Sequence, residues 1–237
     1  MYFAEKVLIT RTGKFKEYDL WVRFLTPQRG VLTGFAFGGC RSRRRFCGCL
    51  DPLNLVLFKV NSSPGNKYLT LEEGSLICGY PELKKNQAKL GMAVNSLRFV
   101  QKICLEGDDS AQLYNLTIDY LQTLEDIPEA PVFLPLLFRA KACFIHGFGP
   151  SIDSCRDCGK QLINIADPFF LYAQGRMACP GCMSKAYRGI KVRRDSLLFM
   201  NRLRETRPYE WAQWSLSNDL LKDCYQIVEA LVGFHIE

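Results

Sequence analysis

Hydrophobic and polar positions alternate along the first 80 residues, and this period predicts short strands. In the clearest of them, Leu20, Val22 and Phe24 share one face. Turn-forming segments at 26–30 and 61–66 separate neighbouring strands. About five short strands in this length are typical of a small closed barrel of the OB type, although an SH3-like barrel has the same pattern. The expected strands cover residues 7–10, 20–25, 31–37, 53–60 and 67–72.

From Tyr80 onward the period changes to that of amphipathic helices. The expected helices cover residues 90–104, 113–124, 134–145, 196–205 and 217–232. A cysteine-rich segment lies between the third and the fourth of them and interrupts the helical region. We therefore expect a multidomain α+β protein with three parts. These are an OB-type barrel at 1–80, a helical domain at 81–150 and 190–237, and an inserted module at 151–189.

Four cysteines form two Cys-x-x-Cys pairs, Cys155 with Cys158 and Cys179 with Cys182. The tight turn within each pair directs two thiolates toward one metal ion, and two pairs complete a tetrahedral shell that suits Zn²⁺. With four cysteine ligands no position is open for water. The spacing therefore predicts one structural zinc ion and no catalytic metal.

The remaining cysteines have mostly apolar neighbours and are expected to be small buried hydrophobic residues. The total of 11 cysteines is odd, and we expect a reducing compartment, which argues against a disulfide framework. These remaining cysteines are Cys40, Cys47, Cys49, Cys78, Cys104, Cys143 and Cys224.

Residues 38–45, here called the basic loop, follow an expected strand and combine two glycines with four arginines. The nearest downstream acid is Asp51, so these arginines cannot all find carboxylates nearby. Guanidinium groups match phosphate oxygens bidentately, which predicts binding to the backbone of DNA with weak sequence preference. The expected DNA-binding residues are Arg41, Arg43, Arg44, Arg45, Lys14 and Lys16.

The charge distribution supports a local polyanion site. Residues 1–80 carry 12 Lys and Arg against 6 Asp and Glu, whereas the whole chain has a net charge of +7. Trp21, Phe35 and Phe37 lie near the basic residues and are candidates for stacking on bases. We expect at least two of these three aromatic side chains to belong to the barrel core instead.

The hydrophobic fraction of 48% is sufficient for folded cores, and no apolar run reaches the roughly 20 residues of a membrane span. The first residues lack the order of charged, apolar and small positions of a signal peptide, so we expect a cytoplasmic protein. The sequence has no paired carboxylates, phosphate-binding loop or nucleophile arrangement that would predict an enzyme.

Several segments have a recognisable order and spacing. Residues 13–30 have the pattern of an opening hairpin, 36–45 that of a glycine-arginine loop, and 50–53 that of a strand entry. Residues 137–150 have the pattern of a helix that runs into the first cysteine pair. Together these segments resemble the RecO family of bacterial recombination mediators. Phe37 stands where that family usually has Lys.

The resemblance implies a non-enzymatic protein of the bacterial nucleoid with an OB barrel, a helical domain and an inserted zinc module. It implies binding to single- and double-stranded DNA, annealing of complementary strands, and loading of RecA with the help of RecR. It also implies a site for the acidic, apolar-tipped tail of the single-strand-binding protein (SSB). The helix at 134–145 combines apolar side chains with cations, although a structural ion pair of Arg139 is an alternative. The expected tail-binding residues are Arg139, Lys141, Leu137 and Phe138.

Two other classes of function remain open. An RNA-binding or ribosome-associated protein with an OB barrel and a zinc ribbon would have the same charge pattern, since RNA also offers phosphates. Alternatively, the basic loop of a scaffold protein would bind an acidic protein. Competition between matched DNA and RNA, and the salt dependence of binding, separate these hypotheses.

Overall fold

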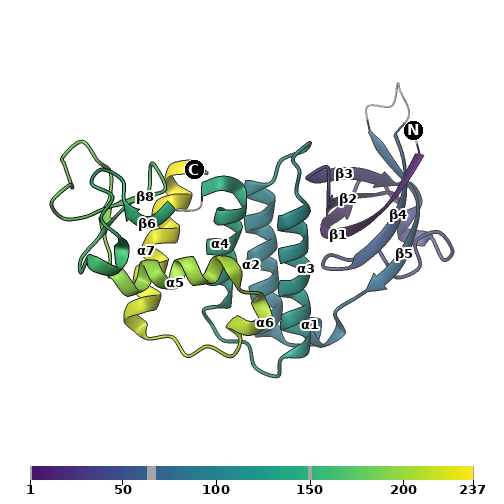
Figure 1. Ribbon diagram of the computed structural model, residues 1–237. Helices are drawn as coiled ribbons and strands as arrows, with labels where there is room; N and C mark the ends of the chain where they lie inside the picture. The colour runs from purple at the N-terminus through teal and green to yellow at the C-terminus, as the bar shows by residue number, and fades with distance from the viewer. Residues whose placement is uncertain (1, 63–67, 149–150, 237) are drawn as a thin grey trace. The chain divides into compact units, whose positions relative to one another are not determined.

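The computed structural model describes residues 2–62, 68–148 and 151–236. The chain divides into two compact units, Met1–Pro128 and Glu129–Glu237 (Figure 1). The helices that follow the barrel belong to the first unit, and the cysteine module belongs to the second. The three-part division inferred from the sequence remains a prediction. Most of the turn at 61–66 and the residues 149–150 lie outside the described part.

Five strands of the first unit form a closed barrel in the order β1-β2-β3-β5-β4. Neighbouring strands are antiparallel except for the parallel pair of β3 and β5. This is the five-stranded OB-type arrangement, so the prediction of an OB barrel is confirmed. The first and last strands are longer than their alternation predicted. The strands are β1 (Tyr2–Lys14), β2 (Leu20–Leu25), β3 (Val31–Ala36), β4 (Leu55–Asn61) and β5 (Leu69–Cys78).

All five strands contribute buried apolar side chains to the barrel core, including Val22 and Phe24 of the alternating segment. Phe46, Cys49 and Leu50 also belong to this core, although they come from the connection between β3 and β4. Because these three side chains are buried, the segment that follows the basic loop is fixed against the barrel.

Three helices complete the first unit. They are α1 (Pro81–Lys85), α2 (Gln87–Ile103) and α3 (Ala111–Asp126). Asn86 caps α2, since its side chain accepts hydrogen bonds from the backbone N–H groups of residues 88 and 89. Ser110 joins α3 to the β2–β3 turn: its hydroxyl donates to the Thr26 carbonyl at 2.6 Å and accepts from Gly30 N at 3.1 Å. This buried contact fixes the barrel to its helices.

The second unit combines helices with a small four-stranded sheet. The sheet has the order β6-β8-β7-β9. α4 packs against α5, α6 and α7, and the apolar periodicity predicted the three longer of these helices. None of the described helices is long and apolar enough to cross a membrane. The elements are α4 (Leu134–Cys143), β6 (Ser151–Cys155), β7 (Phe169–Leu171), β8 (Arg176–Ala178), β9 (Ile190–Lys191), α5 (Arg194–Glu205), α6 (Pro208–Trp211) and α7 (Asn218–His235).

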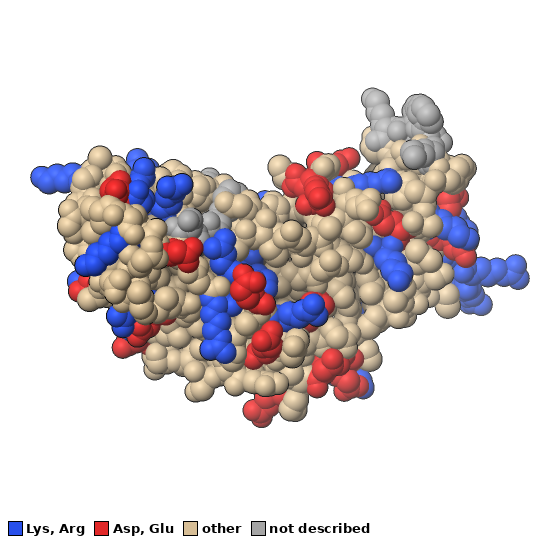
Figure 2. All heavy atoms as spheres, in the orientation of Figure 1, with Lys and Arg blue, Asp and Glu red and all other residues tan. Residues whose placement is uncertain are grey.

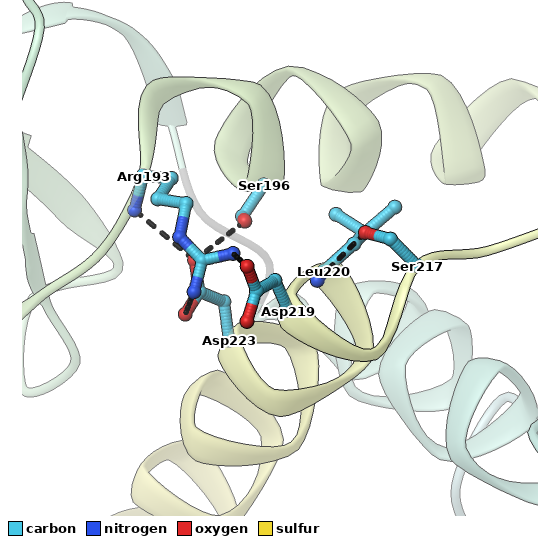
Figure 3. A network of polar contacts seen from close by, with 6 residues as sticks. All are labelled: Arg193, Ser196, Ser217, Asp219, Leu220 and Asp223. Atoms are coloured by element: carbon cyan, nitrogen blue, oxygen red, sulfur yellow. Dashed lines mark hydrogen bonds and ion pairs between the residues drawn. The ribbon is translucent and has the colours of Figure 1, made fainter.

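Asp223 on α7 holds the N-terminus of α5, where the chain leaves the cysteine module (Figure 3). Its carboxylate is only 6% exposed and accepts hydrogen bonds from Ser196 Oγ at 2.7 Å and Arg193 N at 3.2 Å. The Arg193 guanidinium pairs with Asp223 and with the exposed Asp219. The N-cap residue of α5, Arg193, offers no side-chain cap of its own. Asp223 therefore caps α5 from a different helix.

We predict that Asp223→Ala lowers the free energy of unfolding by about 1.5–3 kcal/mol, because it leaves a buried hydroxyl and a helix N-terminus without their charged acceptor. Asp219→Ala is the matched control, and it should cost less than about 1 kcal/mol because its ion pair is exposed. Urea unfolding of the metal-loaded proteins measures both values. Equal losses for the two variants would show that Asp223 has no capping role.

Candidate metal centre and nucleic-acid interface

The two Cys-x-x-Cys segments meet at one end of the small sheet. Cys155 ends β6 and Cys179 directly follows β8, and β6 and β8 are neighbours in the sheet. Each segment folds back in a tight turn, in which Gly159 N donates to the Cys155 carbonyl and Cys182 N to the Cys179 carbonyl, both at 3.0 Å. Gly159 has a φ of +72°, which favours glycine. Sheet pairing thus brings together two turns that are distant in sequence.

The four sulfur atoms of Cys155, Cys158, Cys179 and Cys182 lie within 4.8 Å of one another. The Sγ atoms of Cys158 and Cys179 are 3.8 Å apart. A tetrahedral ion with metal–sulfur bonds of about 2.3 Å requires sulfur separations of about 3.8 Å, so this spacing fits a single bound ion. The cluster can therefore hold a metal ion with four thiolate ligands.

The pKa values of these thiols also agree with a site for a bound cation. Burial opposes ionisation of Cys155, but hydrogen bonds from the backbone N–H groups of Cys158, Cys179 and Asp157 outweigh it and lower its pKa to about 6. The pKa of Cys182 is raised by its thiol contacts with Cys179 and Cys158. Four thiolates this close cannot all ionise without a cation between them.

The other cysteines differ in their exposure. Cys49, Cys104, Cys143 and Cys224 are buried as expected, and burial raises the pKa of Cys143 and Cys224 to about 12. Cys40 and Cys47 are exposed and Cys78 is partly exposed, contrary to the expectation that all seven are buried. Cys40 directly precedes the arginines, and Cys47 follows them between the buried side chains of Phe46 and Cys49.

The basic loop begins at the end of β3 and contains one turn of 3-10 helix, Gly39–Arg41. All four arginines are exposed (Figure 2 shows basic side chains projecting at the right edge of the barrel). Arg41 lies 3.5 Å from the centre of the Tyr18 ring, and Arg45 Nη2 donates to the Phe37 carbonyl at 2.6 Å. Arg43 and Arg44 form no ion pair or hydrogen bond with the described residues. The loop therefore offers at least two uncommitted guanidinium groups.

The β1–β2 hairpin lies beside the basic loop. Cys40 N donates to the Tyr18 carbonyl at 3.0 Å, and Gly38 N donates to Asp19 Oδ1 at 2.8 Å. Lys14 and Lys16 are exposed in the same hairpin. The fold thus brings together the two basic segments that the sequence singled out, although contact of each residue with DNA stays a prediction.

The expectation that at least two of Trp21, Phe35 and Phe37 belong to the barrel core is wrong. Trp21 and Phe35 are partly exposed and Phe37 is 44% exposed. All three lie outside the buried cluster, because the inward positions of β2 and β3 are those of Val22, Phe24, Leu32 and Ala36. Trp21, Phe35 and Phe37 occupy positions that alternate with these inward residues, and this alternation in the sequence could have shown that they face outward.

The predicted tail-binding residues lie on α4, but they do not form an apolar surface. Leu137 and Phe138 are fully buried. Arg139 is partly exposed and pairs with Glu229 of α7 at 3.6 Å, and the Lys141 ammonium donates to the Thr206 carbonyl. Of the four residues, Arg139 and Lys141 are partly exposed, and each has a contact within the protein. The ion pair of Arg139 with Glu229 is the structural alternative that the sequence left open for this residue.

The fold and the site define a class of multidomain protein. It has an OB-type barrel with a basic loop, a helical region, and a four-cysteine cluster able to hold a metal ion. Family models named Recombination protein O N terminal and C terminal match residues 1–80 and 86–237. The chain belongs to the RecO family.

Curated relatives support this assignment over the whole chain. A protein from Oleidesulfovibrio alaskensis is 39% identical over 236 residues, and one from Maridesulfovibrio salexigens is 37% identical over 236 residues. A third, from Lawsonia intracellularis, is 33% identical over 239 residues. Each alignment covers 100% of this chain and 95% of the relative, and each relative is named DNA repair protein RecO.

We predict that Cys158→Ser abolishes metal binding and lowers thermal stability, whereas Cys47→Ser changes neither. Both cysteines are exposed, so neither substitution removes core packing. Elemental analysis of the purified wild type should find about one metal ion per chain. Retention of that ion by Cys158→Ser, or full stability of a metal-free wild type, would contradict a four-thiolate structural site.

Proposed function

We propose that this protein is a DNA-binding recombination mediator, and that the basic loop is its main contact with DNA. The observation that carries the proposal is the exposed arginine set beside an OB-type barrel, with Arg43 and Arg44 uncommitted among the described residues. Guanidinium groups in such a position bind phosphates of any sequence. Membership of a family whose relatives are named for DNA repair supports DNA over RNA as the polyanion.

The proposed role is non-catalytic. Binding to single- and double-stranded DNA through phosphate contacts lowers the repulsion between two strands, which promotes annealing of complementary sequences. With RecR as a partner, the protein would help load RecA on DNA coated with SSB in the bacterial cytoplasm, associated with the nucleoid. Each of these steps requires binding and release and no bond cleavage.

We also propose that the metal is Zn²⁺. Four thiolates with the spacing of a tetrahedron suit this ion, and they leave no position for water or substrate. The residues that would hold it are Cys155, Cys158, Cys179 and Cys182. Its role would be structural, since the strands of the module are only two to five residues long.

For the SSB tail we propose a contact at Arg139. The guanidinium is partly exposed on α4 and would exchange its pairing with Glu229 for an acidic residue of the tail. Because Leu137 and Phe138 are buried, they would position the helix and would not contact the tail directly. Lys141 is engaged with the Thr206 carbonyl and has the same supporting role.

We predict that Arg43→Ala/Arg44→Ala weakens DNA binding for all sequences. Each lost phosphate contact should reduce the slope of log K against log salt by about 0.7 on single strands and about 0.9 on duplex. Fluorescence anisotropy over a salt series measures this slope. We expect the same protein to bind matched RNA less tightly than DNA.

The control is Lys222→Ala/Arg202→Ala, which removes the same net charge from exposed positions of the second unit. If both double variants lose affinity equally, the effect is one of net charge. Unchanged affinity of the loop variant at low salt would place the DNA site elsewhere on the protein.

We predict that Arg139→Ala weakens binding of an isolated SSB tail peptide at least about fivefold, as expected for a charged contact, while binding to bare DNA stays intact. Glu229→Ala is the matched variant, because it breaks the same ion pair but keeps the cation. It should bind the peptide as well as the wild type or better. Isothermal titration calorimetry with the tail peptide measures the affinity of both variants. Equal weakening by both substitutions would mean that Arg139 has only a structural role.

A further inference from the structure

Four aromatic side chains gather on the outside of the barrel, beside the basic loop. Phe35 is the central ring, and its centre lies 4.8 Å from Phe15, 6.3 Å from Phe37 and 5.3 Å from Tyr68. Phe15 and Tyr68 meet edge-on with Phe35, whereas Phe37 lies almost parallel to it, at 20°. We call these four residues the aromatic platform.

The outer rings of the platform are unusually exposed. Phe15 is 50% exposed, Phe37 44% and Tyr68 63%. Single exposed apolar side chains are common on protein surfaces, but a contiguous group marks a site of binding. The barrel core does not need these rings, since it is filled from the other face of the same strands. The platform therefore exposes ring surface to solvent and, among the described residues, lies outside the packed core of the barrel.

Further aromatic and cationic side chains lie beside the platform on the neighbouring strands β1 and β2. Phe35 pairs with Trp21 across β2 and β3, and Trp21 pairs with Gly13 on β1. A Cβ atom at Gly13 would lie 2.5 Å from Trp21 Cε2, so the indole lies directly against the strand. Arg11 lies 5.6 Å from the centre of the indole ring. A row of aromatic and cationic side chains thus continues across the three strands.

The charges around the platform are mainly positive. Lys16 Nζ lies 5.6 Å from the centre of the Phe15 ring, and Arg45 donates to the carbonyl of Phe37 itself. The two acids of the hairpin are both engaged locally. Asp19 accepts a hydrogen bond from Gly38 N, and Glu17 accepts one from the Tyr18 hydroxyl. Flat ring faces with a basic rim fit a ligand that combines aromatic rings with negative charges.

We propose that the aromatic platform stacks unpaired bases of single-stranded DNA while the basic loop holds the phosphates. This inference rests on the proposed DNA-binding function and assigns it a second component. Bases in a duplex are stacked on one another and cannot reach the rings, whereas both forms of DNA offer phosphates. The platform therefore gives this protein a preference for single strands that the basic loop alone does not provide.

The test compares two single-stranded oligomers of equal length, an oligo-dT and an abasic oligomer that has the same phosphates without bases. The wild type should bind oligo-dT at least about fivefold more tightly, which is the effect of one stacked base. Phe15→Leu/Phe37→Leu/Tyr68→Leu keeps apolar side chains at these positions but removes the rings. In this variant the two oligomers should bind equally, and affinity for the abasic oligomer and for duplex should match the wild type.

Two controls separate this inference from the proposed function. Tyr209→Leu removes an aromatic side chain that is 56% exposed on α6, and it should leave the preference for oligo-dT unchanged. Arg43→Ala/Arg44→Ala should lower the affinity for both oligomers by the same factor. Retained duplex binding by the triple variant shows that its barrel is folded.

Four results would overturn the inference. Equal affinity of the wild type for the two oligomers would exclude stacking while leaving the phosphate site intact. A triple variant that loses affinity for both oligomers together would show that the rings only shape the basic loop. Self-association of the wild type in sedimentation, absent from the triple variant, would identify the platform as an interface between copies of this chain. Failure of the wild type to bind any of the oligomers would overturn the proposed function as well.

Discussion

Closure of the barrel between β3 and β5 is the contact on which the proposed nucleic-acid face depends. It consists of two residue pairs, Gly34 with Leu69 and Phe35 with Thr70. A Cβ atom at Gly34 would lie 2.9 Å from Leu71 Cδ2, so glycine permits the close approach of the two strands. The same pairing sets Tyr68 beside Phe35. Without it, Phe35 and Tyr68 would lie at opposite edges of an open sheet.

The two units obtain their stability in different ways. The barrel is a closed sheet filled with apolar side chains, and its helices are joined to it by the buried hydroxyl of Ser110. The cysteine module has short strands and a small core, so a metal ion held by its four cysteines would stabilise it together with the Asp223 contacts. A module of this kind can be stable only when its ligands are complete. The barrel has no such requirement.

Much of this organisation could be predicted from periodicity and spacing. Alternation over 20–25 and 31–37 predicted the central strands, and helical periodicity predicted α2, α3, α4, α5 and α7. The Cys-x-x-Cys pairs identified the four cysteines that can hold a metal ion, because the geometry of each pair is local. Two expectations were wrong. At least two of Trp21, Phe35 and Phe37 were expected in the barrel core, and Cys40 and Cys47 were expected to be buried. An apolar residue type does not show which face of a strand it occupies or whether a loop enters the core.

The sequence by itself determined the kinds of element, the four cysteines of the candidate metal site and the basic character of the loop, because each depends on residues close together in the chain. Only the tertiary structure decided which of these features share a surface. Phe15 and Phe37 meet Phe35 through the neighbouring strands β1, β2 and β3, whereas Tyr68 joins them because the barrel closes between β3 and β5. Leu137 and Phe138 are withdrawn from the surface because α4 packs against its neighbouring helices. Long-range packing, which no local pattern encodes, thus separates the residues that stabilise this protein from those that can meet a partner.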